Sequence, residues 1–212
     1  MTVIAFPYWL ELQRRLGGVA SRSLARQLLS WTMALLLASA CASAAAEVAS
    51  ASATAASEDR LEAAFLYKFL NYVEWPASAF AKADAPYVIG IVDADDVADE
   101  LHKIANGRNV NNRPVLVKKL AKTDTPEGVH VLFIAREAHL RQPQLFKQAR
   151  QEPILVVTET DDALKQGSMI NFKIVDERLR FDVALEPVEK SGLKLSSRLL
   201  TVASSTIKAP PP

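Results

Sequence analysis

Residues 87–104 read YVIGIVDADDVADELHKI, and this stretch decides the fold class. Its first six residues, YVIGIV, form a short apolar run with β-branched side chains, which is typical of a buried strand. An acidic turn follows, and then Val97, Leu101 and Ile104 recur at the spacing of one helical face. The stretch therefore predicts a strand followed directly by a helix, the unit from which α/β proteins are built.

The same alternation continues toward the C-terminus. Further strands are predicted at residues 114–120, 129–135 and 154–158, with a helix carrying Leu140 and Phe146 before the last of them. Three of the four strand runs are continuously apolar, as strands covered on both faces are. We therefore expect a single α/β domain with a mostly parallel sheet flanked by helices.

Beyond this part, the pattern changes to alternating apolar and polar residues. Residues 169–175 and 179–185 alternate on either side of the Asp176-Glu177 turn, which predicts a C-terminal antiparallel hairpin. A last helix is expected at residues 189–203. The hairpin should lie at one side of the sheet.

Ahead of the first strand, residues 61–76 read LEAAFLYKFLNYVEWP and predict an amphipathic helix. One face carries Leu61, Phe65, Phe69 and Tyr72. Ser57 is the expected N-cap, and Pro76 is the expected stop. Because one face is so apolar, other structure must cover this helix.

Residues 1–46 predict a secretory signal peptide. Four arginines precede the uncharged run LLSWTMALLLASA at residues 28–40, and small residues follow it. The run is shorter than the roughly 20 apolar residues that a transmembrane helix needs. Cleavage near Ala40 or Ala46 is favoured over an uncleaved signal anchor, and export to the periplasm is expected.

Cys41, the only cysteine, stands where a bacterial lipoprotein carries its lipidated cysteine. The usual leucine three residues earlier is missing, so loss of Cys41 with the signal peptide is favoured over lipid anchoring. In either case the exported domain has no partner for an intramolecular disulfide.

The composition of residues 47–212 limits the possible partners of the exported protein. Of 25 basic and 24 acidic residues, residues 1–46 hold four Arg and one Glu, which leaves 21 basic, 23 acidic and a net charge of −2. This balance argues against a nucleic-acid partner. The Ala/Ser-rich residues 47–57 predict a flexible tether, residues 58–205 the folded domain, and residues 206–212 a disordered Pro-rich tail.

Several landmarks occur in an order that resembles the YfiR-like family. They are Ala63-Ala64-Phe65-Leu66-Tyr67, Glu74-Trp75-Pro76, Gly107-Arg108 with Arg113, Val131-Leu132-Phe133-Ile134, Gly167 to Phe172, Phe181-Asp182-Val183 and Gly192 to Leu200. The resemblance covers residues 60–204. It implies a periplasmic, non-catalytic regulator that inhibits an inner-membrane diguanylate cyclase or another sensor protein and so lowers cyclic di-GMP. Release by an outer-membrane lipoprotein and homodimer formation are further expectations, and no cofactor or metal is implied.

This chain departs from the family in one respect. Members often carry cysteines, one of them just before the VLFI strand, where this chain has His130. A stabilising disulfide is therefore not expected here. By itself, His130 in an apolar strand predicts a satisfied core residue rather than a metal ligand.

A regulator needs an exposed surface with aromatic anchors and polar surroundings. The candidate contact residues are Trp75, Phe80, Arg108, Arg113 and Arg198. Tyr87 extends the same aromatic set. For Trp75 the alternative is a purely structural role beside Pro76, and for the arginines it is local ion pairing.

Two other functions remain open from the residues. Asp93 and Asp95 follow the first strand at the spacing of haloacid-dehalogenase-like phosphatases, with Thr158, Asp161-Asp162 and Lys118 or Lys119 as further candidate groups. Capping of the following helices explains the same acids. A small-ligand sensor is the third hypothesis, with no residues assigned.

Overall fold

The computed structural model describes residues 52–82, 84–121, 123–136, 138, 143–160 and 162–208. The chain separates into two compact units at residue 54, and the fold below is that of the unit beginning at Ala55. The predicted signal peptide and Cys41 lie outside the described residues.

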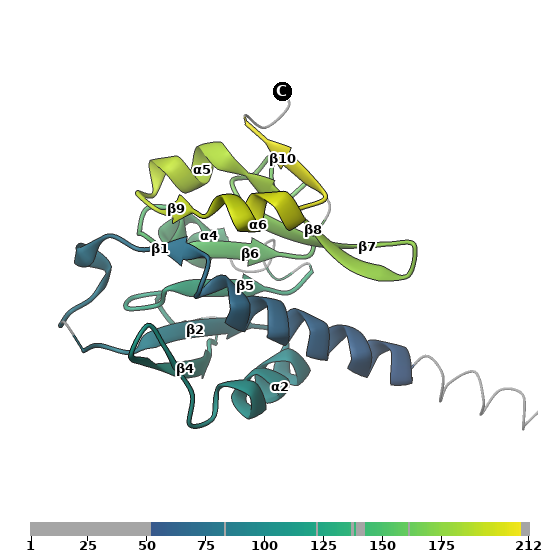
Figure 1. Ribbon diagram of the computed structural model, residues 1–212, viewed down its shortest axis with the longest axis horizontal. Helices are drawn as coiled ribbons and strands as arrows, with labels where there is room; N and C mark the ends of the chain where they lie inside the picture. Colours follow the sequence, from purple (N-terminus) through teal and green to yellow (C-terminus); the bar gives the residue numbers. More distant parts are fainter. Residues whose placement is uncertain are drawn as a thin grey trace, which may run out of the picture. The chain divides into compact units, whose positions relative to one another are not determined.

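The unit is built on an eight-stranded, mostly parallel sheet with helices on both faces (Figure 1). The strand order is β10-β8-β7-β6-β5-β2-β4-β3. The strands are β2 (Tyr87–Val92), β3 (Asn109–Val110), β4 (Arg113–Lys119), β5 (Val131–Ile134), β6 (Leu155–Thr158), β7 (Ile170–Val175), β8 (Arg178–Ala184) and β10 (Ser205–Ile207). The helices α2 (Asp95–Ala105) and α4 (Pro143–Ala149) follow β2 and β5, respectively, along the chain. The predicted fold class is confirmed.

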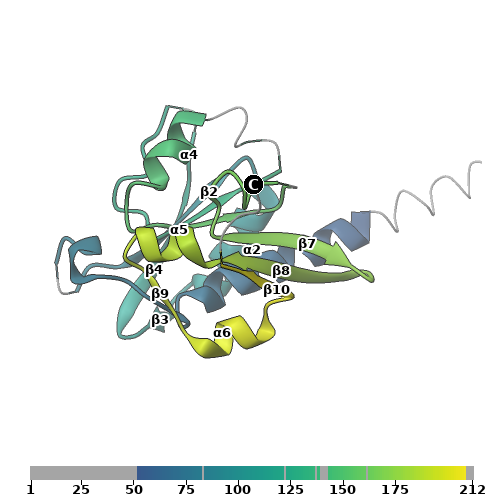
Figure 2. The same cartoon turned by 90° about the horizontal axis from the view of Figure 1, so that it is seen from above.

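The central strands show why continuous apolar runs indicated a buried sheet. Every residue of β2, β5 and β6 is buried. Within β5, Val131 and Phe133 face one core cluster, whereas Leu132 and Ile134 face the other. The first cluster also contains residues of α2, and the second contains residues of α4. Figure 2 shows α4 on the opposite side of the sheet from α6 (Ser197–Val202).

A phenylalanine cluster, formed by Phe65, Phe69, Phe172 and Phe181, attaches the first helix to the sheet. This helix crosses one face of the sheet and contributes the first two rings (Figure 1). The ring centroid of Phe69 lies 5.5 Å from that of Phe181 and 6.0 Å from that of Phe172. The amphipathic pattern thus correctly predicted a helix whose apolar face is covered by other structure, which is here an apolar face of the sheet.

The limits of the first helix differ from the prediction. Residues 52–57 are already helical, so Ser57 is not an N-cap and this part of the predicted tether belongs to the helix. The helix ends at residue 69, ahead of Pro76, and residues 70–72 form a turn. The strand β1 (Val73–Glu74) follows and pairs with β9 (Lys194–Leu195). Because this strand pairing competes with helix, the chain leaves the helix before it reaches the proline.

The C-terminal region is also more divided than predicted. The expected hairpin is present as the antiparallel pair β7 and β8, with positive φ at Asp176 and Glu177 in its turn. The predicted helix at residues 189–203 is wrong, because α5 (Leu185–Lys190), β9 and α6 replace it. Thr206 and Ile207 pair with β8 as part of β10, so the predicted tail begins too early.

Candidate functional site

Three of the five predicted contact residues meet around His130. This histidine cluster consists of Trp75, Phe80, Tyr87, His130 and Arg113. The His130 ring centroid lies 4.6 Å from that of Phe80, 5.5 Å from that of Tyr87 and 6.1 Å from that of Trp75. Trp75 also donates its Nε1 hydrogen to the His130 carbonyl over 3.2 Å. Residues 55 positions apart in the chain are therefore joined at one end of β5.

His130 is the buried centre of this cluster, with only 3 % of its surface exposed. Its Nδ1 accepts a hydrogen bond from the Val88 amide at 3.1 Å, so the neutral ring carries its proton on Nε2. Among the described residues Nε2 has no well-formed hydrogen bond, although the Ala79 backbone is near it. Burial lowers the pKa of His130 to about 4, and the contact with Ala79 opposes this shift. The predicted core role is correct, but only one ring nitrogen is well satisfied.

Arg113 acts as an anchor within the histidine cluster. Its guanidinium carbon lies 3.9 Å from the Phe80 ring centroid, and its Nη1 donates to the Ala85 carbonyl at 2.7 Å. These contacts fasten the loop before β2 to the start of β4. Trp75 and Phe80 are half-buried, so each ring has a packed part and an accessible part.

Arg108 and Arg198 lie on other elements. Arg108 follows α2, and Arg198 is in α6; both side chains are exposed. Within the described part of the chain neither takes part in an ion pair. The five predicted residues thus form one cluster of three and two separate cationic positions.

A second candidate site is an acidic pocket of about 330 Å³ at the carboxyl ends of three parallel strands. The strands β2, β5 and β6 end at its wall, where open α/β sheets commonly build sites. The first helix and the start of α2 close its other sides. Its acidic lining residues are Glu58, Asp59, Glu62, Asp93, Asp95, Asp96 and Glu159. Arg136 is the basic residue of the lining.

Glu62 is the most buried of the acidic residues that line this pocket, with 6 % of its surface exposed. Glu159 lines the same pocket. Burial first, and then the charge and hydrogen bond of Glu159, raise the pKa of Glu62 to about 9. Its protonated form is therefore favoured well above the ordinary range of a carboxyl group.

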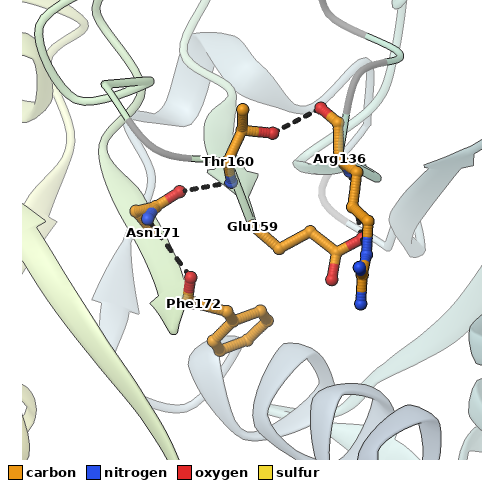
Figure 3. Close-up of polar contacts among 5 residues, drawn as sticks. All are labelled: Arg136, Glu159, Thr160, Asn171 and Phe172. Atoms are coloured by element: carbon orange, nitrogen blue, oxygen red, sulfur yellow. Dashed lines mark hydrogen bonds and ion pairs between the residues drawn. The ribbon is translucent and has the colours of Figure 1, made fainter. Parts of the chain in front are cut away.

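Glu159 is held in place by Arg136, as Figure 3 shows. Its Oε1 accepts a hydrogen bond from the Arg136 amide at 3.0 Å and lies 3.7 Å from the Arg136 Nε. Thr160 donates its hydroxyl hydrogen to the Arg136 carbonyl and its amide hydrogen to Asn171 Oδ1, the latter over 3.0 Å. The loops after β5 and β6 are thereby tied to β7.

The residues that the phosphatase hypothesis requires do not come together in one site. Asp93 and Asp95 line the acidic pocket, but Lys119 forms ion pairs with Asp95 and Asp99 at 3.0 and 2.8 Å. Thr158 is buried, and its hydroxyl group forms hydrogen bonds with the side chains of Ser168 and Asn171. Asp161 is outside the described residues, and Lys118 is exposed.

The alternative explanation of these acids, helix capping, is correct only in part. Asp95 and Asp96 occupy the first turn of α2, where carboxylates favour the helix dipole. The N-cap itself is Ala94, which offers no side-chain hydrogen bond. The described residues contain no group of three or more His, Cys, Asp or Glu side chains arranged to hold a metal ion.

Sequence reasoning missed the Glu62 and Glu159 pair. A signal existed for the first of them, because Glu62 precedes Leu66 by four residues and so interrupts the buried stripe of the first helix. Nothing in the sequence showed that Glu159, nearly a hundred positions later, would meet it.

One comparison with known proteins identifies a relationship over almost the whole described domain. Residues 59–204 match the family model described as YfiR/HmsC-like. Within the described part of the chain, no helix is long and apolar enough to cross a membrane. The match begins in the first helix and ends just before β10.

Proposed function

Because the chain belongs to the YfiR/HmsC-like family of periplasmic regulators, we propose that it binds and inhibits a membrane-bound signalling protein. On the basis of the family, the proposed target is an inner-membrane diguanylate cyclase. Inhibition of this enzyme would lower the cellular level of cyclic di-GMP. The observation that carries the proposal is the match over residues 59–204. An outer-membrane lipoprotein and a second copy of this chain are further proposed partners.

The proposed contact surface is the accessible side of the histidine cluster. Trp75 and Phe80 are anchored by their packed parts, so their accessible parts lose little conformational entropy on binding. Such half-buried aromatic rings are the residue type that dominates binding energy at interfaces. Arg113 holds Phe80 in place, and its role is therefore positioning rather than direct contact.

Arg108 and Arg198 are proposed as charged partner-binding positions separate from the histidine cluster. Exposed charges of this kind change the rate of association and its salt dependence more than they change packing. Since neither forms an ion pair among the described residues, reversing its charge leaves the fold unperturbed. These two residues are therefore clean probes of partner binding outside the histidine cluster.

The test is the cyclic di-GMP content of a strain from which this protein has been deleted. Complementation uses the wild type, Trp75→Ala, Arg108→Glu and Arg198→Glu, with protein abundance measured in each strain. Lys147→Glu, an exposed lysine of α4 with no ion pair in the described chain, is the matched control. We expect cyclic di-GMP to rise on deletion and to return to its original level with the wild type and with Lys147→Glu.

Failure of Trp75→Ala at normal abundance supports the aromatic contact, and failure of either arginine variant supports a second contact at that arginine. An unchanged cyclic di-GMP level on deletion contradicts the cyclase as target. Full complementation by all three variants contradicts the proposed surface, whatever the target.

A further inference from the structure

The strand β4 has an outer side that is open along most of its length. On one side it pairs with β2, from Val115 to Lys119. On the other side its only described partner is the two-residue strand β3, which pairs with Arg113 and Pro114 (Figure 1 shows β4 at the lower side of the sheet). No strand of the described chain therefore covers the outer side of residues 115–119, which we call the β4 edge.

The register shows which backbone groups point outward along the β4 edge. The Leu120 amide, just beyond β4, donates to the Ile91 carbonyl of β2 over 2.8 Å. Because backbone groups alternate in direction along a strand, the even-numbered residues of β4 face β2 in the same way. The amides and carbonyls of Val115, Val117 and Lys119 point away from β2, where no described strand pairs with them. Such a row of backbone groups is a template for a further strand.

A groove of about 690 Å³ lies beside the β4 edge, where the C-terminal end of α2 and the loop after it approach β4. Its lining includes the four consecutive residues from Pro114 to Val117. Successive side chains of a strand point to opposite faces of the sheet, so a groove that touches all of them lies along the strand's edge. The groove is therefore located where a further strand would lie.

The groove is basic. Its lining contains His102, Lys103 and Arg108, and among the described residues that form it there is no Asp or Glu. Arg108 forms no ion pair in the described chain, and the pair of Lys103 with Glu100 at 2.7 Å involves a mostly exposed lysine, so it is weak. Lys118, farther along the β4 edge, is also exposed. The charge of the groove thus favours a ligand with carboxylate side chains.

The face of the β4 edge that lies opposite α2 offers an apolar contact. Val115 and Val117 pack into the core cluster that contains α2, whereas Leu116, on the other face, is 48 % exposed. A second copy of the β4 edge is a poor occupant, because it would bring the lysines at positions 118 and 119 of two chains together. The occupant that fits is an extended segment with acidic side chains on one face and apolar ones on the other.

We propose that the β4 edge binds an extended acidic segment of a partner protein as an additional strand of the sheet. The outward backbone groups supply hydrogen bonds, and alternate side chains of the segment supply specificity. Its acidic side chains lie toward Lys103 and Arg108, and its apolar side chains lie beside Leu116. This inference goes beyond the proposed function, since its test uses a peptide and does not depend on the membrane target.

The probe is a short synthetic peptide in which glutamate and valine alternate, titrated into the purified protein and followed by nuclear magnetic resonance. We expect the largest shifts at the amides of Val115, Val117 and Lys119, because these would donate hydrogen bonds to the peptide. The same peptide with lysine in place of glutamate should bind at least about tenfold more weakly, because the groove is basic. Unchanged amide signals at the β4 edge with millimolar peptide, or equal binding of the two peptides, overturns the proposal.

Two variants test the β4 edge itself. Val117→Pro removes an outward amide and spares the hydrogen bonds to β2, and proline is tolerated on edge strands. It should weaken binding of the glutamate peptide about tenfold, through the loss of one hydrogen bond. Leu116→Glu loses an apolar contact and sets an acid beside the acidic peptide, which should weaken binding at least about threefold.

Ile174→Glu in β7 is the matched control for Leu116→Glu, because Ile174 is 49 % exposed and also lies on a strand. It should bind the glutamate peptide as the wild type does. If Val117→Pro does not fold, the comparison of Leu116→Glu with Ile174→Glu decides. Equal affinities of these two glutamate variants overturn the proposal.

Discussion

Phe69 is the side chain whose removal tests most directly how the first helix is held to the sheet. Only 1 % of its surface is exposed, and its ring contacts three others of the phenylalanine cluster. Phe69→Ala removes the ring and leaves a cavity between helix and sheet, because the neighbouring strands cannot collapse into it.

The expected loss is about 3–5 kcal/mol of the free energy of unfolding, the usual range for a buried Phe replaced by Ala. The edge-to-face contact with Phe181, at 5.5 Å and 76°, places the value toward the upper end. Against a total stability of about 5–15 kcal/mol, this is a third or more of the whole for many domains. For a domain of this size it corresponds to roughly 10 °C in Tm.

The assay is urea unfolding followed by far-ultraviolet circular dichroism, with the wild type, Phe69→Ala and Phe69→Leu in parallel. Phe69→Leu keeps most of the apolar volume and should cost less than about 1.5 kcal/mol. The dependence of the unfolding free energy on urea should be unchanged in both variants. A loss under about 1 kcal/mol for Phe69→Ala would refute the view that this ring anchors the helix.

Two further predictions concern the buried polar groups. Thr158→Val removes a hydroxyl that bonds Asn171 Oδ1 at 2.8 Å, and should cost about 1–3 kcal/mol because the partner loses a buried hydrogen bond. The exposed Thr201→Val is the matched control, expected within about 0.5 kcal/mol of the wild type by the same urea unfolding, and equal effects in the two variants would contradict the reasoning. For His130, the folded pKa of about 4 lies below the ordinary value of 6.5, so its stabilising contribution is complete above about pH 6.5 and is lost as the pH falls toward about 4. His130→Gln can still accept the Val88 hydrogen bond without titrating, and its free energy of unfolding should fall less steeply than that of the wild type between about pH 6.5 and pH 5; parallel profiles would show that His130 does not titrate in this way.

Much of the secondary structure was readable because local patterns carry it. The limits of β2 agree with the run YVIGIV, and the hairpin of β7 and β8 follows from alternation around Asp176-Glu177. Elements shorter than four residues were not readable. The strands β1, β9 and β10 have two or three residues each, too few for any periodicity, and they form only because distant partners meet them.

The sequence indicated several residues of the candidate sites, but it did not indicate which of them lie together in the fold. Trp75, Phe80 and Arg113 were predicted as contact residues, and the fold places them around His130, whereas Arg108 and Arg198 lie elsewhere. Asp93 and Asp95 suggested a strand-end site, and the acidic pocket is indeed there. The lining residue whose pKa is raised most is Glu62, and the sequence pattern showed it only as one polar residue on a helix.

By itself, the sequence determined the fold class, the succession of the principal strands along the chain and the family, because hydrophobic periodicity and the order of landmarks are properties of the chain alone. The tertiary structure decided which distant side chains meet and what their surroundings do to them. Arg113 becomes an anchor through its contact with Phe80, and burial near Glu159 raises the pKa of Glu62. The physical reason is that charge, desolvation and packing act through space over a few ångströms, whereas the residues concerned are up to a hundred positions apart.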